Sequence, residues 1–348
     1  MKRQDYKSSN RILIIISVLL IVVLAGLYIV FGRGNGKESV WKYESYEYFD
    51  TITEITIYDS YSEEEYEELK SFITERLNYY HQLFDIYHNY DGINNAKVIN
   101  DKAGIEPVTV PEELCTLIDK GRLMYIETQG KLNIALGPVL EIWHTYREEG
   151  KELPPTGTLI KAAANTHIED VQVKGNVVYL NREGMKLDLG SIGKGYAAEL
   201  IAEDLKERGI KNALISLGGN IVAVGDKHKE GYTVGIEDPE KEGNSKVILK
   251  IKDTSVVTSG DYQRYYEVDG KRYCHIIDPD SLYPTEYYRS VTVICNSSFM
   301  ADAYATALFN MDYKTGYEMV DSFDDIEAMW ILKDGTVKYS KGFEQYIK

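Results

Sequence analysis

The stretch that decides the fold is Lys186–Gly219, which reads KLDLGSIGKGYAAELIAEDLKERGIKNALISLGG. A short apolar segment leads into a glycine-rich turn, apolar residues recur with helical spacing over 196–208, and strand-like residues follow Gly209. This order predicts a βαβ-like unit. Glycines in the first turn let backbone amides approach an anion closely, and the helix adds the positive end of its dipole. The stretch therefore predicts a site for a phosphate group.

Two known nucleotide motifs and one purely structural role compete with this interpretation. Residues 193–198 fit the loose GxGxxG/A dinucleotide pattern, but Ser216 stands where the acidic residue of that motif belongs. A P-loop is disfavoured because Gly195 follows Lys194 where Ser or Thr is required. A tight strand-to-helix turn that binds no ligand stays open as the third alternative.

Composition limits the class of protein. The chain has 348 residues, 44% of them hydrophobic, which suits one large domain or two smaller ones. Its formal net charge is −16 and it has no cluster of Lys and Arg beyond the N-terminus, which argues against nucleic acid as a partner. Cys115, Cys274 and Cys295 lack metal-ligand spacing, and no disulfide is required.

The N-terminal segment is predicted to anchor the protein in the cell membrane. Residues 12–31 form a nearly unbroken apolar run, about the 20 residues that a helix needs to cross a bilayer. The basic residues of segment 1–11 place that segment in the cytoplasm by the positive-inside rule, and the rest of the chain outside. A cleaved signal peptide is the alternative. We expect a single-pass protein with a linker over 32–42 and one extracytoplasmic domain over 43–348.

Periodicity elsewhere predicts a mixture of strands and helices, and hence an α+β fold. The expected helices cover 62–85, 112–129, a short segment after Gly137-Pro138, 196–208 and 300–309. The expected strands cover 46–58, the entry at 131–136, hairpins that turn at Gly175-Asn176 and Asp269-Gly270, and the segment before Ser297. Residues 85–100 are expected to form a loop, and the segment 151–181 is polar up to its hairpin.

The hairpin that turns at Asp269-Gly270 brings His275 and Asp278 near one of its ends. A histidine on a strand is more often a packed or surface residue than a catalytic one. Spacing alone therefore leaves both roles open.

The stretch 291–312, VTVICNSSFMADAYATALFNMD, suggests a metal-binding pair. Ser297 is a helix-capping residue, and Asp302 and Thr306 lie four residues apart on one face of the helix that follows. A carboxylate and a hydroxyl are hard oxygen ligands that suit Mg²⁺, which completes its coordination with water and substrate phosphates. The alternative is a half-exposed Asp beside a Thr that donates to a backbone carbonyl.

Four motifs in this order resemble those of the FAD:protein FMN transferase family, the ApbE-type flavinyltransferases. They are DLGSIGKGYAAE at 188–199, NALISLGGNIVAVG at 212–225, TSGDYQRYYEVDGKRYCHIIDP at 258–279 and ADAYATAL at 301–308. The resemblance extends from about Tyr48 to near the C-terminus. It implies an α+β body that binds FAD as substrate and Mg²⁺ as cofactor. In the implied reaction FAD is split, AMP is released, and FMN forms a phosphoester with a Thr or Ser hydroxyl of an acceptor protein.

The resemblance also assigns roles to particular residues. The metal ligands would be Asp302, Thr306 and Ser191, the last through a backbone carbonyl. The flavin contacts would be Phe49, Tyr87, Lys131, Leu132, Asn133, Asp188, Lys194 and Ile276. The acceptor hydroxyl must lose a proton, and we take His275 as the general base, with Asp278 as its orienting partner.

Two other functions remain compatible with the sequence. The same cleavage with water as nucleophile would make the protein a FAD pyrophosphatase that releases FMN and AMP. An anchored flavin-binding protein without activity is the second, although the presence of Asp188, Asp302 and Thr306 argues against it. The predicted location outside the cytoplasm suits exported acceptor flavoproteins of membrane electron-transfer systems.

Overall fold

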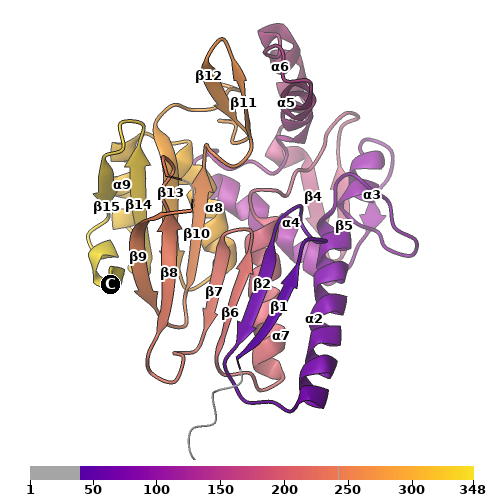
Figure 1. Cartoon of the computed structure of the whole chain (residues 1–348). Coiled ribbons are helices and arrows are strands. Elements are labelled where there is room, and N and C mark those ends of the chain that lie inside the picture. Colours follow the sequence, from indigo (N-terminus) through magenta and orange to yellow (C-terminus); the bar gives the residue numbers. More distant parts are fainter. Residues whose placement is uncertain (1–39, 242) are drawn as a thin grey trace, which may run out of the picture.

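An antiparallel sheet of eight strands forms the centre of the computed structural model, which describes residues 40–241 and 243–348 (Figure 1). Every neighbouring pair of strands runs antiparallel. In spatial order the strands are β1 (Trp41–Ser45), β2 (Thr53–Ile57), β6 (Ala213–Leu217), β7 (Asn220–Val224), β10 (Ser255–Gly260), β13 (Tyr288–Cys295), β14 (Ile326–Leu332) and β15 (Val337–Tyr339).

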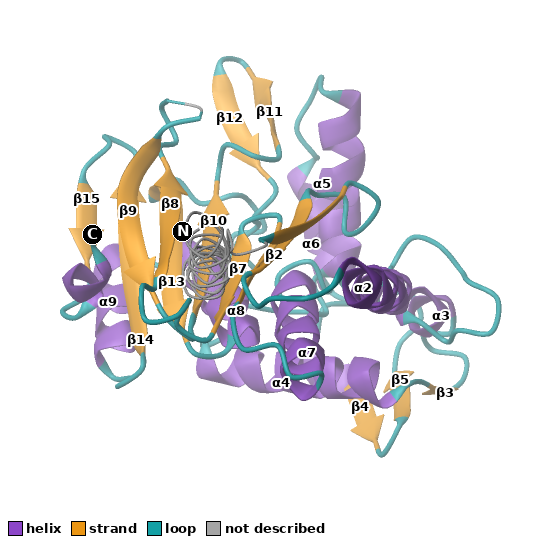
Figure 2. Cartoon of the chain, turned by 60° about the horizontal axis from the view of Figure 1, so that its bottom comes forward, coloured by secondary structure: helices purple, strands orange, loops and turns teal. Residues whose placement is uncertain are grey.

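Both faces of this sheet are covered. The main core joins one face to helices, including α2 (Glu63–Phe84), α4 (Glu112–Glu127), α7 (Gly193–Glu207) and α8 (Ser298–Phe309). The hairpin of β8 (Tyr232–Glu237) and β9 (Ser245–Ile251) packs on the other face, as Figure 2 shows. Val293 of β13 therefore belongs to the first core and its neighbour Ile294 to the second. Coverage on both sides explains why β13 is apolar along most of its length.

Side-chain caps set the start of the helices that the sequence predicted well. Ser62 and Glu65 form a reciprocal capping box at α2, in which the Ser62 amide donates to Glu65 Oε2 at 2.8 Å. Ser297 Oγ accepts from the Met300 amide at 3.2 Å and starts α8.

The two predicted hairpins are confirmed. The first joins β4 (Val171–Lys174) to β5 (Val177–Leu180), and β3 (Val108–Thr109) pairs with β5. The second joins β11 (Tyr265–Val268) to β12 (Lys271–Cys274). Its turn residues Asp269 and Gly270 both have positive φ, 52° and 75°, as a tight two-residue turn requires.

The predicted βαβ-like unit is wrong in its first part. The segment KLDL at 186–189 is irregular, and the Asp188 amide donates to the carbonyl of Ile134 at 2.8 Å. The expected strand at 131–136 is irregular too. Helix α7 begins inside the glycine turn, at Gly193, and leads into β6 as expected.

Three shorter elements also differ from expectation. The predicted loop 85–100 ends in α3 (Ala96–Asp101), and the polar segment after 151 contains α6 (Thr156–Ala163). Strand β1 starts at Trp41, inside the expected linker 32–42. The remaining helices are α5 (Gly137–Glu149) and α9 (Tyr313–Asp321), with short 3₁₀ turns at Ile168–Asp170 and Phe343–Tyr346.

The predicted membrane span at 12–31 and the segment 1–11 lie outside the described residues. Within the part of the chain that the structure describes, no helix is both long enough and apolar enough to cross a membrane.

Candidate active site

The glycine turn meets the start of α8. The Gly195 amide donates to Asp302 Oδ2 at 2.8 Å. A Cβ on Gly195 would lie 2.4 Å from the carbonyl oxygen of Ser298 and 2.5 Å from Cβ of Asp302. Only glycine permits so close an approach between the two helices. The predicted meeting of the two distant segments is therefore confirmed.

A second contact between α7 and α8 fixes how the two helices lie. The Glu199 carboxylate of α7 accepts from Ser297 Oγ at 2.5 Å and from the Phe299 amide at 3.1 Å. Lys120 of α4 pairs with the same carboxylate at 3.5 Å. An acidic side chain thus caps α8 from outside the helix, which favours its N-terminal end.

The predicted metal ligands supply oxygen atoms around this contact. Asp302 is only 4% exposed, and burial raises the pKa of its carboxyl against the opposing effect of Lys194. Thr306 follows one turn later on the same helix, and Ser191 lies in the glycine turn, both half-buried. Ser298 Oγ, at the start of α8, is buried without a hydrogen-bond partner among the described residues.

Lys194 lies among three of the predicted site residues. The Lys194 charge opposes the rise that burial causes in the pKa values of Asp188 and Asp302, and it contributes to the lowered pKa of His275. Its Nζ donates to the Gly190 carbonyl at 3.4 Å. Burial raises the pKa of Asp188, whose Oδ1 accepts from the Gly190 amide at 2.9 Å. The structure thus brings together a lysine, two carboxyls and an imidazole from separate parts of the chain.

His275 is held by the backbone of Arg264. Its amide donates to the Arg264 carbonyl at 2.9 Å, and its ring Nδ1 lies 3.2 Å from the same oxygen. A carbonyl only accepts, so Nδ1 carries the proton and Nε2 has a free lone pair. Burial, with the positive charges of Lys194, Arg264 and Arg147, lowers the pKa of His275 to about 3.

The predicted pair between Asp278 and His275 is not formed. Asp278 Oδ1 instead accepts from Lys131 Nζ at 2.8 Å, and its Oδ2 accepts from the Ser281 amide at 3.1 Å. Lys131 also pairs with Asp280 at 2.8 Å. Asp278 therefore stabilises the turn after β12 and fixes Lys131, while the Arg264 carbonyl orients the imidazole.

The remaining predicted flavin contacts divide into accessible and buried side chains. Tyr87 is 54% exposed, and its partial burial together with the charge of Asp188 raises its pKa to about 12. Leu132 and Ile276 are 1% and 6% exposed and belong to the core. Their side chains are therefore engaged in packing.

Phe49 and Asn133 are tied to the protein itself. Phe49 has a left-handed backbone, with φ of 56°, and its amide donates to His81 Nδ1 at 3.2 Å. Asn133 Nδ2 donates to the carbonyl of Thr166 at 2.9 Å.

The statistical model of the ApbE family matches residues 49–330, which is more than half of the chain. The chain belongs to the ApbE family. Two curated relatives of this ApbE-family chain are named FAD:protein FMN transferase. The relative from Klebsiella pneumoniae (strain 342) is 34% identical over 261 residues, which span 73% of this chain and 81% of the relative. The relative from Treponema pallidum (strain Nichols) is 32% identical over 268 residues, which span 72% of this chain and 74% of the relative.

Solved structures of the ApbE family have the same fold. The ApbE protein of Thermotoga maritima has a TM-score of 0.80 at 28% identity, and covers 89% of this chain and 100% of its own. A histidine-to-glycine variant of flavin transferase ApbE from Vibrio cholerae has a TM-score of 0.77 at 25% identity. The match covers 88% of this chain and 99% of the Vibrio chain. The α+β fold expected from the resemblance is therefore confirmed.

Sequence reasoning missed two arginines in this ApbE-family site. Arg147 lies on α5, and Arg264 lies in the turn before β11. Burial and the charge of Arg264 both lower the pKa of Arg147, and α5 packs in one small core with the hairpin that follows Arg264. The only signal in the sequence was the spacing of His144 and Arg147 on one helix, and it does not show what that helix faces.

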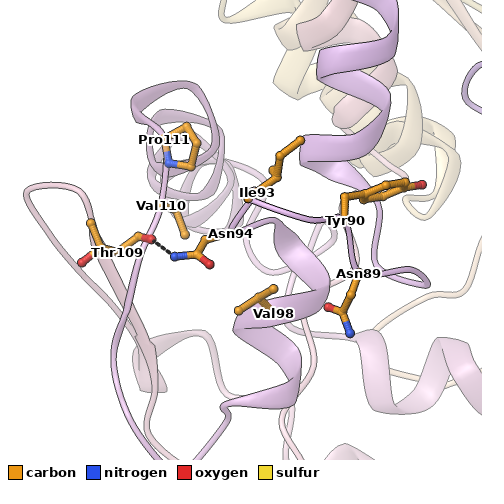
Figure 3. Close-up of a pocket in the computed structure, with 9 residues that line it drawn as sticks. Asn89, Tyr90, Ile93, Asn94, Val98, Thr109, Val110 and Pro111 are labelled. Carbon is orange, nitrogen blue, oxygen red and sulfur yellow. Dashed lines mark hydrogen bonds between the residues drawn. The ribbon is translucent and has the colours of Figure 1, made fainter.

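A groove lies away from the glycine turn and the start of α8. It has a volume of about 440 Å³, and Figure 3 shows its lining, which includes Asn94 with its hydrogen bond to the carbonyl of Thr109 at 2.8 Å. The lining consists of Asn89, Tyr90, Gly92, Ile93, Asn94, Val98, Thr109, Val110 and Pro111. It contains no cationic side chain and none of the predicted site residues, so it does not suit a diphosphate.

Proposed function

We propose that this protein transfers FMN from FAD to a hydroxyl of a protein acceptor and releases AMP. The observation that carries the proposal is the contact between Gly195 and Asp302, which joins an anion-binding turn to a buried carboxylate. Membership of the ApbE family supports it, as do the relatives named FAD:protein FMN transferase.

The glycine turn would bind the diphosphate of FAD. The amides of Gly190, Ile192, Gly193 and Gly195 donate to Asp188, Leu189 and Asp302. The amides of Ser191 and Lys194 have no hydrogen-bond partner among the described residues, and α7 carries no side-chain cap there. Together with the helix dipole and the Lys194 ammonium group, these amides suit a dianionic ligand.

Asp302, Thr306 and Ser191 would hold a magnesium ion. These residues offer the oxygen ligands that Mg²⁺ prefers: the Asp302 carboxylate, and hydroxyl or carbonyl oxygens of Thr306 and Ser191. Burial disfavours the charged form of Asp302, so a bound cation would stabilise it. No group of three or more His, Cys, Asp or Glu side chains suited to a metal occurs within residues 40–241 and 243–348. A cation held by so few protein ligands leaves coordination positions for substrate phosphates. When bound, Mg²⁺ would neutralise the negative charge of the phosphates during displacement.

His275 would act as the general base. Its Nε2 takes the proton of the acceptor hydroxyl while the hydroxyl oxygen attacks the phosphorus of the FMN moiety, and the P–O bond to AMP breaks. Without substrate, burial and neighbouring positive charges lower the pKa of His275 to about 3. An anionic substrate offsets those charges, so the imidazole gains proton affinity when the base is needed.

The anchor and the location remain part of the proposal. The apolar run at 12–31 would hold the domain at the outer surface of the cell membrane, near exported acceptor flavoproteins. Its support is the sequence pattern alone.

One assay separates the transferase from its two rivals. The purified chain is incubated with FAD, Mg²⁺ and a candidate acceptor, with and without EDTA, and AMP and the intact mass of the acceptor are measured. A transferase gives AMP and an FMN-bearing acceptor only when metal is present. AMP with free FMN and an unmodified acceptor would instead show a pyrophosphatase, and no AMP would show a binding protein.

A further inference from the structure

We propose that Arg147 and Arg264 bind the FMN phosphate of FAD on the His275 side of the glycine turn. This inference rests on the proposed transfer reaction and adds the residues that hold the transferred group.

Packing brings the two arginines together from distant parts of the chain. Helix α5 and the β11–β12 hairpin share a small core. Figure 1 shows the two elements beside each other at one end of the molecule. In that core the Trp143 ring lies 6.1 Å from the Tyr273 ring, and Trp143 Nε1 donates to the Leu282 carbonyl at 2.8 Å. Arg147 follows one turn after Trp143, and Arg264 precedes the hairpin. The same core therefore positions both guanidinium groups.

Each arginine uses only part of its donor capacity within the protein. One terminal nitrogen of Arg147 lies 2.7 Å from His144 Nδ1, and one of Arg264 donates to the Asp50 carbonyl at 3.1 Å. A guanidinium has five N–H donors in a planar fork. Donors therefore remain on both residues for a ligand with several acceptor oxygens, such as a phosphate.

Neither charge is neutralised by a close carboxylate. In the described ranges 40–241 and 243–348, no carboxylate oxygen lies within 4.0 Å of the nitrogens of either side chain. Arg76 and Arg289, by contrast, contact Asp204 and Asp261 at 2.7 and 3.0 Å. Two like charges that act on each other without such partners are unfavourable until an anion binds.

The carboxylates that interact electrostatically with Arg147 at longer range are those of Glu148 and Asp188. Glu148 pairs with His144 Nε2 at 3.1 Å. Asp188 is engaged by the Gly190 amide, and burial raises its pKa. The positive charge around His275 therefore stays largely uncompensated.

The location of the two arginines indicates that they bind the phosphate of the FMN half of FAD and not that of the AMP half. The Arg264 carbonyl accepts from the His275 amide at 2.9 Å and lies 3.2 Å from its ring Nδ1, so Arg264 is next to the base. Arg147 lies on α5, which packs in one small core with the hairpin that follows Arg264. Asp302 instead contacts Gly195 of α7. The arginines thus lie on the His275 side of the site. The phosphorus under attack must lie beside the group that takes the proton, and in this reaction that phosphorus belongs to FMN.

Binding to FMN and to riboflavin tests the assignment, because the two ligands differ by the phosphate alone. We expect Arg147→Gln and Arg264→Gln to weaken FMN and FAD binding about tenfold to a hundredfold, the usual value of a charged hydrogen bond. Riboflavin affinity should stay at the wild-type value. Flavin fluorescence, measured with EDTA and without acceptor, gives the dissociation constants. Arg182→Gln is the matched control, since Arg182 is 51% exposed and pairs with Asp170 on the surface.

Three outcomes would overturn the proposal. Equal losses for FMN and riboflavin would place the arginines on the flavin ring. Unchanged FAD and FMN affinities with a raised KM for the acceptor would assign them to the acceptor. Unchanged values throughout would leave them no role in binding. Because the FMN and riboflavin dissociation constants are measured without turnover, a chain that proves to be a hydrolase still gives a clear answer.

A folding defect is separated by two further measurements. The unfolding temperature of each variant without flavin should match the wild type, since no ion pair is lost. Arg147→Lys and Arg264→Lys keep the charge but lose the fork, and should bind FMN with intermediate affinity. If the Lys variants bind FMN as poorly as the Gln variants while riboflavin binding also falls, the phosphate assignment is wrong.

Discussion

At the scale of single residues, the site depends on the absence of a side chain at Gly195. We expect Gly195→Ala to lower the free energy of unfolding by about 1–3 kcal/mol, the usual cost of overpacking. The added methyl group would meet Ser298 and Asp302 at 2.4 and 2.5 Å, so transfer activity should fall as well. Urea unfolding and the transfer assay measure the two effects.

Gly157 in α6 provides the control for this substitution. A Cβ at Gly157 meets nothing within 4 Å, and its φ is not left-handed. Gly157→Ala should therefore leave stability unchanged or raise it by about 0.5–1 kcal/mol. Similar losses for both variants would show that close packing at Gly195 is not the cause.

His275 gives a prediction about pH. Its pKa is about 3 in the folded protein against an ordinary 6.5, so the unfolded chain binds the proton more readily. The wild type therefore loses stability from this residue as pH falls from 6.5 to about 3. His275→Asn should lose less over that window, and transfer should drop by about 10²–10⁴-fold while FAD still binds.

Urea unfolding of the wild type and of His275→Asn at several pH values isolates the contribution of His275 to the free energy of unfolding. The raised pKa values of Asp188 and Asp302 give the opposite slope, but they act in both proteins. Identical pH profiles would mean that neither burial nor the nearby positive charges lower the pKa of His275 in the folded protein. Transfer at the wild-type rate would remove it from the mechanism.

At the scale of elements, the hairpin that carries His275 is fixed at its base by a buried carboxylate. Asp261 is 3% exposed and accepts from Arg289 at 3.0 Å and from Lys333 at 2.6 Å, with Arg272 of β12 at 3.8 Å. Asp261→Asn should cost about 3–5 kcal/mol, because it removes the anion and leaves the cations partly buried. It should also reduce transfer, since the hairpin ends at His275.

Glu286→Gln is the comparison for that element. Glu286 pairs with Lys271 on the same hairpin, but its side chain is 68% exposed, so its loss should cost less than about 1 kcal/mol. Urea unfolding of both variants decides the point. A cost for Asp261→Asn no larger than that for Glu286→Gln would show that the buried charge cluster does not hold the hairpin.

Elements with strong local signals were predictable, and elements without them were not. The capping box at Ser62 and the turn at Asp269-Gly270 act within a few residues, and both are formed as expected. The segment KLDL has the pattern of a strand, yet its Asp188 amide bonds to Ile134 in another irregular segment. A pattern of apolar residues reports burial and does not show which partner the backbone has.

The candidate site shows the same division. Helix spacing and the motif resemblance both pointed to Asp302, the resemblance supplied Lys194, and the need for a base near the hairpin supplied His275. The meeting of the glycine turn with α8 followed from the chemistry of binding a diphosphate. The orienting partner of His275 was wrong because a backbone carbonyl, that of Arg264, leaves no sequence signal. Arg147 was missed because its role depends on packing of α5 against the hairpin, which only the folded chain reveals.

At the scale of the whole molecule, the body and the predicted anchor should be separable. The core is formed by residues within 40–241 and 243–348, and β1 begins at Trp41. A chain that starts at Val40 is expected to have the unfolding temperature and transfer activity of the full chain. In cells it should appear in the soluble fraction, whereas the full chain should sediment with membranes. Equal distribution of both chains would contradict the anchor.

The claim on which the account depends is that the Gly190–Gly195 turn and the start of α8 together hold a diphosphate. A crystal structure of the protein with FAD and Mg²⁺ tests it directly. We expect the diphosphate between the turn and Asp302, with the FMN phosphate towards Arg147 and His275. A diphosphate bound elsewhere, for example in the groove beside Asn94, with no ligand near Asp302, would contradict the account.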